Sequence, residues 1–155
     1  MSQDSEAVWR WSGKSPYVLQ NGDPVFVSLA KGLPLQFMNS AMNIPENLGL
    51  KSRVYQGLER MAPGLTSNLH IEACHELNRS RALFVLCDNA ADDWISGKVG
   101  DALRRGVIGW IYFLSKSGQQ SMTPFDTLFP TRLIRDPEHF STAFRRDLLV
   151  FMGRL

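Results

Sequence analysis

The sequence has only two cysteines among its 155 residues. Cys87 lies inside an apolar run and Cys74 inside a predicted helix, so both are typical of reduced cysteines that act as small hydrophobic residues. No segment approaches the ~20 consecutive apolar residues that a transmembrane helix requires. Residues 1–11 are polar and acidic, whereas a signal peptide would be basic and then apolar. We therefore expect a soluble, cytoplasmic protein.

An excess of one charge is also lacking, because the formal net charge is only +2. The basic residues are scattered, which indicates a solvated surface rather than a track for nucleic acid. The sequence contains no GxxxxGK[ST] phosphate-binding motif and no Ser-His-Asp or Cys-His pattern. His70, Cys74 and His75 could suggest a metal site, but His75 is rotated away from the other two on a helix. Since no second pair of ligands accompanies them, we predict no metal.

The remaining composition, 44% hydrophobic and 21% charged, is that of an ordinary globular protein. A chain of this length can bury a complete core as one domain. Asn21-Gly22-Asp23-Pro24 is a strong turn signal. It divides the chain into an N-terminal arm or hairpin, residues 1–22, and a main domain, residues 23–155.

The clearest structural signal is the stretch Ser80–Gly106. It begins with an unbroken apolar run at 82–87, which suits a strand buried on both faces. A polar loop at 88–93 and a helical segment follow, and a second apolar strand is expected at 107–114. This order defines a βαβ unit whose loop lies at the carboxyl end of a parallel strand. Open α/β sheets bind their ligands there.

Further strands and helices alternate along the rest of the chain. The other strands are expected at 25–29, 52–55 and 133–134. The other helices are expected at 35–43, from 66 or 67 to 79, and from 137 to the C-terminus. Five strands alternating with helices predict an α/β fold: a single doubly wound, mainly parallel, flavodoxin-like sheet with helices on both faces.

Apolar spacing predicts which face of each helix is buried. In the helix at 35–43, Leu35, Met38 and Met42 recur at helical spacing and are expected to face the core. Pro45 and Gly49 are expected to end this helix. In the C-terminal helix, which Asp136-Pro137-Glu138 should begin, the apolar face is expected to consist of Phe140, Phe144, Leu148, Phe151 and Leu155.

Several short segments occur in a characteristic order. These segments are DPVFVS at 23–28, SRVY at 52–55 with LERMAPG at 58–64, ELNRSRALFVL at 76–86, and DWI at 93–95 with Ala102-Leu103. Over residues 23–155 they resemble the Toll/interleukin receptor (TIR) domain family, with its DVFISY, L-x-PG, I-x-x-S-R-x-x-I-V-V-L-S and S-x-W-x-x-x-E-x-x-x-A-L patterns. The resemblance implies the same flavodoxin-like fold as the strand pattern does.

TIR domains act either as homotypic assembly modules or as enzymes that break the nicotinamide–ribose bond of NAD. In the enzymes, a glutamate four residues after the tryptophan is catalytic; here Lys98 stands four residues after Trp94. The resemblance therefore implies a signalling or immune domain that self-associates or binds another TIR-like domain. Trp9, Trp11 and the loop around Pro63-Gly64 would carry that assembly. No cofactor is required, and an NAD-type nucleotide is the implied ligand.

Two nucleotide-based alternatives stay open. Ser96-Gly97 followed by Asp101 is similar to the S-G-x-x-x-E pattern of nucleoside deoxyribosyltransferases and nucleotide N-glycosidases, in which the acid is the nucleophile. This similarity implies an N-glycosidase acting on NAD or a related nucleotide, with Asp101 as the carboxylate and Trp94 stacked near the base. Alternatively, Lys98 and Lys31 would bind the phosphates of a nucleotide without cleaving it.

The candidate site residues form two groups. The catalytic candidates are Asp101 and Lys98. The candidates for nucleotide contact are Ser28, Lys31, Gly32, Asp88, Trp94, Ser96 and Gly97.

Overall fold

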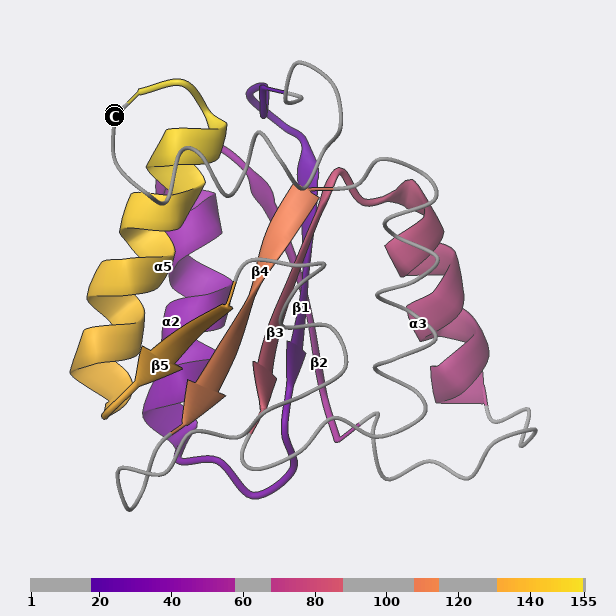
Figure 1. The fold of residues 1–155 in the computed structure, drawn as a ribbon. Coiled ribbons are helices and arrows are strands. Elements are labelled where there is room, and N and C mark those ends of the chain that lie inside the picture. Colours follow the sequence, from indigo (N-terminus) through magenta and orange to yellow (C-terminus); the bar gives the residue numbers. More distant parts are fainter. Residues whose placement is uncertain (1–17, 58–67, 88–107, 115–130, 155) are drawn as a thin grey trace.

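The computed structural model describes residues 18–57, 68–87, 108–114 and 131–154 of the chain (Figure 1). The described elements are β1 (Pro24–Leu29), α2 (Leu35–Asn47), β2 (Lys51–Gln56), α3 (Asn68–Arg79), β3 (Ala82–Cys87), β4 (Ile108–Leu114), β5 (Thr131–Ile134) and α5 (Pro137–Phe151). The five strands form one parallel sheet in the order β2-β1-β3-β4-β5.

The sheet is covered by helices on both faces. Figure 1 shows α2 and α5 side by side on one face and α3 on the other. This arrangement explains the unbroken apolar run of β3, in which all six residues are buried. The α/β, flavodoxin-like fold expected from the sequence is confirmed, and each expected strand is present within two residues of its predicted bounds.

The helix α2 is longer than expected, because it continues through Pro45 to Asn47. A proline inside a helix has no N–H for the carbonyl four residues before it, which here is the carbonyl of Ala41. The Ser52 hydroxyl at the start of β2 donates a hydrogen bond to this carbonyl at 2.7 Å. The prediction that Pro45 ends the helix was wrong because this tertiary contact satisfies the orphaned acceptor.

The predicted buried face of α2 was right only for Met38, which is partly buried against the core, and wrong for Leu35 and Met42. Leu35 and Met42 are 70% and 49% exposed, whereas Phe37 and Ala41 are fully buried. The Phe37 ring lies 5.6 Å from the ring of Phe140 on α5. Packing this large aromatic side chain against α5 fixes the rotation of α2 about its axis, and the smaller Leu35 and Met42 are left at the surface.

The helix α5 supplies most of the aromatic core. Its Phe144 ring packs edge-on against Phe84 of β3, with centroids 5.0 Å apart. As expected, Phe140, Phe144, Leu148 and Phe151 are buried. Asp136 caps the helix by accepting a hydrogen bond from the His139 amide at 2.7 Å. The helix ends at Phe151, and Leu155 lies outside the described residues.

The remaining elements complete the domain. On α3, Ala73 and Leu77 are buried. Before β1, Leu19 is buried in the core and its amide donates to the carbonyl of Phe151 at 2.8 Å. Residues 1–17 of the predicted arm lie outside the described residues. Within the part of the chain that the structure describes, no helix has the length and apolar character of a membrane span.

Candidate functional site

The candidate site is the edge of the sheet at which the parallel strands end. The chain passes from β1 to β2 on one side, and from β3 through β4 to β5 on the other, so the strand order reverses between β1 and β3. Ligands of open α/β sheets bind outside the carboxyl ends of the strands at such a reversal. The residues that follow β1 are therefore the first candidates for ligand contact.

Hydrogen bonds fix the position of the backbone directly after β1. The amide of Ala30 donates to the carbonyl of Leu86 on β3 at 3.0 Å, and the amide of Gly57 donates to the carbonyl of Leu29 at 2.9 Å. From the other side, Nε2 of Gln56 donates to the carbonyl of Ala30 at 3.2 Å. Ala30 is thus held between β2 and β3, so the turn that follows starts from a fixed position.

This turn consists of Lys31 and Gly32, both of which are exposed. Gly32 has a φ of 84°, a backbone conformation that favours glycine, and a side chain added there would meet open space. The stem of Lys31 passes beside Gly57, whose missing Cβ would lie 3.6 Å from the Cβ of Lys31. Among the described residues directly after β1 and β2, Lys31 is the one with a charged side chain.

A lysine in this position suits an anionic ligand. Its ammonium group is a compact positive charge with three donors, which binds phosphate as a point charge. Gln56 and Gly57 were not among the residues predicted from the sequence. Their place beside Ala30 depends on the pairing of β2 with β1, which the sequence alone does not give.

Ser28 lies deeper than the turn. It is 2% exposed, and it is paired with Tyr55 of β2 and Val85 of β3. Side chains alternate along a strand, so Ser28 shares a face of the sheet with Phe26, on the side of α3. The structure therefore brings Lys31 and Gly32 together at the surface and separates Ser28 from them.

The other predicted site residues lie outside the described residues. They are Asp88, Trp94, Ser96, Gly97, Lys98 and Asp101. The same holds for the proposed assembly residues Trp9, Trp11 and Pro63-Gly64. Cys87, the last residue of β3, is buried and is the residue from which the candidate loop begins.

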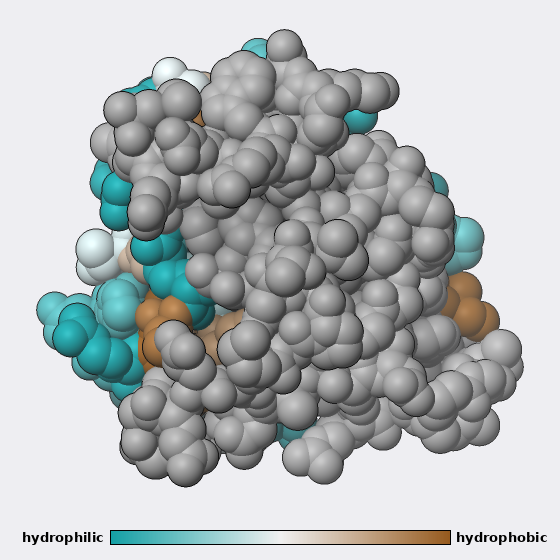
Figure 2. Space-filling view, in the orientation of Figure 1, coloured by the Kyte–Doolittle hydropathy of each residue, from teal (hydrophilic) through white to brown (hydrophobic). Residues whose placement is uncertain are grey.

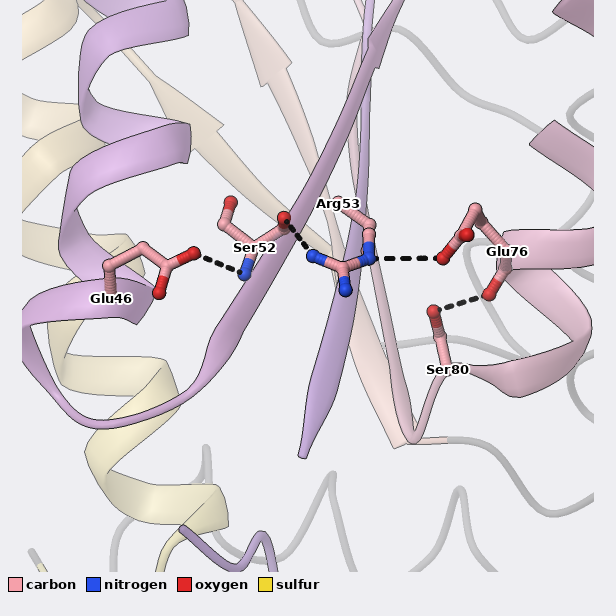
Figure 3. A network of polar contacts seen from close by, with 5 residues as sticks. All are labelled: Glu46, Ser52, Arg53, Glu76 and Ser80. Atoms are coloured by element: carbon pink, nitrogen blue, oxygen red, sulfur yellow. Dashed lines mark hydrogen bonds and ion pairs between the residues drawn. The ribbon is translucent and has the colours of Figure 1, made fainter. Parts of the chain in front are cut away.

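A polar network ties the edge strand β2 to both helical layers (Figure 3). Towards α2, the amide of Ser52 donates to Oε1 of Glu46 at 3.2 Å. Towards α3, Nε of Arg53 binds Oε2 of Glu76 at 3.0 Å, and the Ser80 hydroxyl donates to the Glu76 carbonyl at 2.7 Å. Neighbouring residues of β2 thus contact opposite helices, which fixes the strand before it reaches the candidate site.

Tyr55 lies on the α3 side of β2, where its ring stacks on Phe26 with centroids 5.2 Å apart. Burial raises the pKa of the Tyr55 phenol above its ordinary value. The carboxylates of Glu72 and Glu76 raise this pKa further, because a tyrosinate would be repelled by both, whereas Arg53 acts in the opposite direction. The neutral phenol of Tyr55 is therefore favoured over the tyrosinate.

The most deeply buried charge in the described structure is Asp147 on α5, which is 1% exposed. Its Oδ2 accepts a hydrogen bond from the Tyr112 hydroxyl at 2.7 Å, and its Oδ1 pairs with the Arg132 guanidinium at 2.9 Å. Both partners come from the middle of neighbouring strands, β4 and β5, rather than from the carboxyl edge. This network holds α5 on the sheet and is separate from the candidate site.

Hydrophilic residues also gather over α5 at the left of the molecular surface (Figure 2).

Among the described residues, no group of three or more His, Cys, Asp or Glu side chains could hold a metal ion. The chain matches no protein-family model and no curated protein.

Proposed function

We propose that this chain is a TIR-like signalling or immune domain of the cytoplasm, which works by self-assembly and recognises an NAD-type nucleotide at the carboxyl edge of its sheet. The observation that carries the proposal is the exposed Lys31-Gly32 turn at the point where the strand order reverses. The order of the sequence motifs supports the same class of domain.

The fold supplies the setting for such a ligand. In a parallel sheet all carboxyl ends meet at one edge, so the turn after β1 lies beside the carboxyl end of β3. The hydrogen bond from Ala30 to Leu86 joins the residue directly after β1 to the second-last residue of β3. A nucleotide there would meet the Lys31 ammonium, which suits its phosphates.

Recognition without cleavage is the activity that the residue types favour. Cleavage of the nicotinamide–ribose bond develops positive charge on the ribose, which a carboxylate stabilises and a lysine repels. By the sequence resemblance, Lys98 stands at the position of the family's catalytic glutamate. A lysine there would oppose this reaction and would offer phosphate a second positive charge. The proposed role of the nucleotide is therefore that of a ligand that controls assembly.

Calorimetric titration with NAD, ADP-ribose and ATP tests this proposal. We expect binding by the wild type and a loss of about tenfold in affinity, or about 1.4 kcal/mol, for Lys31→Ala. Lys51→Ala is the matched control, since Lys51 is an exposed lysine at the opposite end of the sheet. The absence of binding by the wild type, or equal losses in both variants, would overturn the proposal.

The second candidate function is an NAD or nucleotide N-glycosidase that uses Asp101. It is favoured by the spacing of Ser96, Gly97 and Asp101, and a single carboxylate suffices because the leaving nicotinamide of NAD is already cationic. Release of nicotinamide from NAD, followed by chromatography at micromolar enzyme, distinguishes the two functions. Release by the wild type that is lost in Asp101→Ala would establish the glycosidase. If the wild type releases no nicotinamide and Lys98→Glu does, the result would support a binding site that lacks its catalytic acid.

A further inference from the structure

One flank of α2 exposes apolar side chains that the core does not use. Leu35 is 70% exposed and Met42 is 49% exposed. With the exposed residues Asn39 and Glu46 they are spaced by four, three and four positions, which places all four on one side of a helix. We refer to Leu35, Asn39, Met42 and Glu46 as the α2 flank.

The charges around this flank are arranged for self-complementarity. From Gly32 to Pro45 the sequence contains no charged residue, in a chain that is 21% charged. A positive residue, Lys31, precedes this neutral stretch, and a negative residue, Glu46, follows it. When a surface binds a second copy of itself, like charges must not lie opposite each other. The stretch has a neutral middle and opposite charges at its two ends, so an antiparallel pair of copies avoids such repulsion.

We propose that the α2 flank is a contact surface between two copies of this chain, in which the α2 helices pack antiparallel around a two-fold axis. An axis midway between Met38 and Asn39 places Leu35 of each copy opposite Met42 of the other. The same axis brings Lys31 of each copy to the end of the helix at which Glu46 of the other lies. Apolar residues thus meet apolar residues, and each end of the contact joins opposite charges.

The size of the surface predicts a weak contact. A helix of 13 residues is about 20 Å long, so the flank buries less than the roughly 800 Å² per partner of a standard stable interface. We therefore expect association with a dissociation constant on the order of 10 μM to 1 mM. Such a contact forms when the local concentration is high, as in a signalling assembly.

This inference rests on the self-assembly in the proposed function and names the surface that would carry it. Lys31 takes part in both proposals, but the apolar contact between Leu35 and Met42 requires no nucleotide. The two are tested by different measurements, because titration with a nucleotide can succeed on a monomer and self-association can be measured without a nucleotide.

Sedimentation velocity of the full chain between about 10 μM and 1 mM tests the surface. We expect concentration-dependent dimerisation of the wild type, and at least about a tenfold weakening in Leu35→Glu and in Met42→Lys, because each places a charge opposite an apolar residue. The double variant Leu35→Glu/Met42→Lys should regain association, since it places glutamate opposite lysine at both contacts. Ile71→Lys is the matched control on α3, where Ile71 is 43% exposed.

Each result has a defined meaning. A wild type that stays monomeric throughout this range would overturn the proposal. Dimerisation that Leu35→Glu and Met42→Lys leave unchanged would also overturn it, while leaving self-assembly through another surface intact. Weakening by both single variants, recovery in the double variant and no effect of Ile71→Lys would support both the surface and its antiparallel register.

Discussion

The hydroxyl of Tyr112 on β4 donates a hydrogen bond to Oδ2 of Asp147 on α5, with the two oxygens 2.7 Å apart and both residues at most 1% exposed. Arg132 on β5 binds the second carboxylate oxygen at 2.9 Å. One helix is thereby joined to two neighbouring strands through a single buried charge. Removing a partner from such an arrangement leaves the others desolvated and unsatisfied.

We predict that Asp147→Ala lowers the free energy of unfolding by about 3–5 kcal/mol, because it leaves a largely buried guanidinium without its counter-charge. Tyr112→Phe should cost about 1.5–3 kcal/mol, the range for a hydrogen bond to a charged group. Urea unfolding followed by circular dichroism measures both. Thr142→Ala, at an exposed position of the same helix, should stay within about 0.5 kcal/mol of the wild type. A loss below about 1 kcal/mol in Asp147→Ala would contradict a buried, paired charge at this position.

The contact between Ser52 and the helix α2 predicts a coupling with Pro45. In the wild type, Ser52→Ala should cost about 1–3 kcal/mol, because it leaves the carbonyl of Ala41 without its donor. In a Pro45→Ala background the new N–H of residue 45 can donate to the same carbonyl, so Ser52→Ala should cost less. A double-mutant cycle in urea measures the difference. Equal costs in both backgrounds would show that the Ser52 hydroxyl does not compensate for the proline.

The raised pKa of Tyr55 predicts a loss of stability at alkaline pH. Because the folded state has the higher pKa, the unfolded chain loses this proton first as the pH rises through about 10, the ordinary value for tyrosine. The stabilising contribution is therefore complete below that pH and is lost as the pH rises through the folded pKa. Unfolding in urea between pH 8 and pH 11 should show a steeper decline for the wild type than for Tyr55→Phe. Identical slopes would contradict the raised pKa.

The strands could be predicted from the sequence because a strand that is buried on both faces is a continuous apolar run. A run such as Ala82–Cys87 has no polar residue to place at a surface, so its length and composition were sufficient. For the helix α2, the sequence did not decide which face is buried. Leu35 with Met42 and Phe37 with Ala41 both fit helical spacing, and only the packing of Phe37 on Phe140 decides which pair is buried.

Contacts between distant segments left no local signal. Asp147 lies directly after Arg145 and Arg146 in the sequence, yet its hydrogen bond to Tyr112 joins residues 35 positions apart. At the candidate site, Ser28 was expected among the nucleotide contacts, and only the structure shows that it lies on the buried α3 side of the sheet. The position of Gln56 and Gly57 beside the turn after β1 follows from the strand order, which a single sequence does not specify.

Nuclear magnetic resonance titration of the isotopically labelled chain with NAD tests the central claim most directly, because it locates the ligand on the sheet. We predict that the amide signals of Ala30, Gly32 and Gly57 at the carboxyl edge shift as NAD is added. The amides of Lys51 and Arg81, which are hydrogen-bonded at the opposite edge, should stay unchanged. Shifts confined to Lys51 and Arg81, or no shifts up to millimolar NAD, would contradict nucleotide recognition at the carboxyl edge.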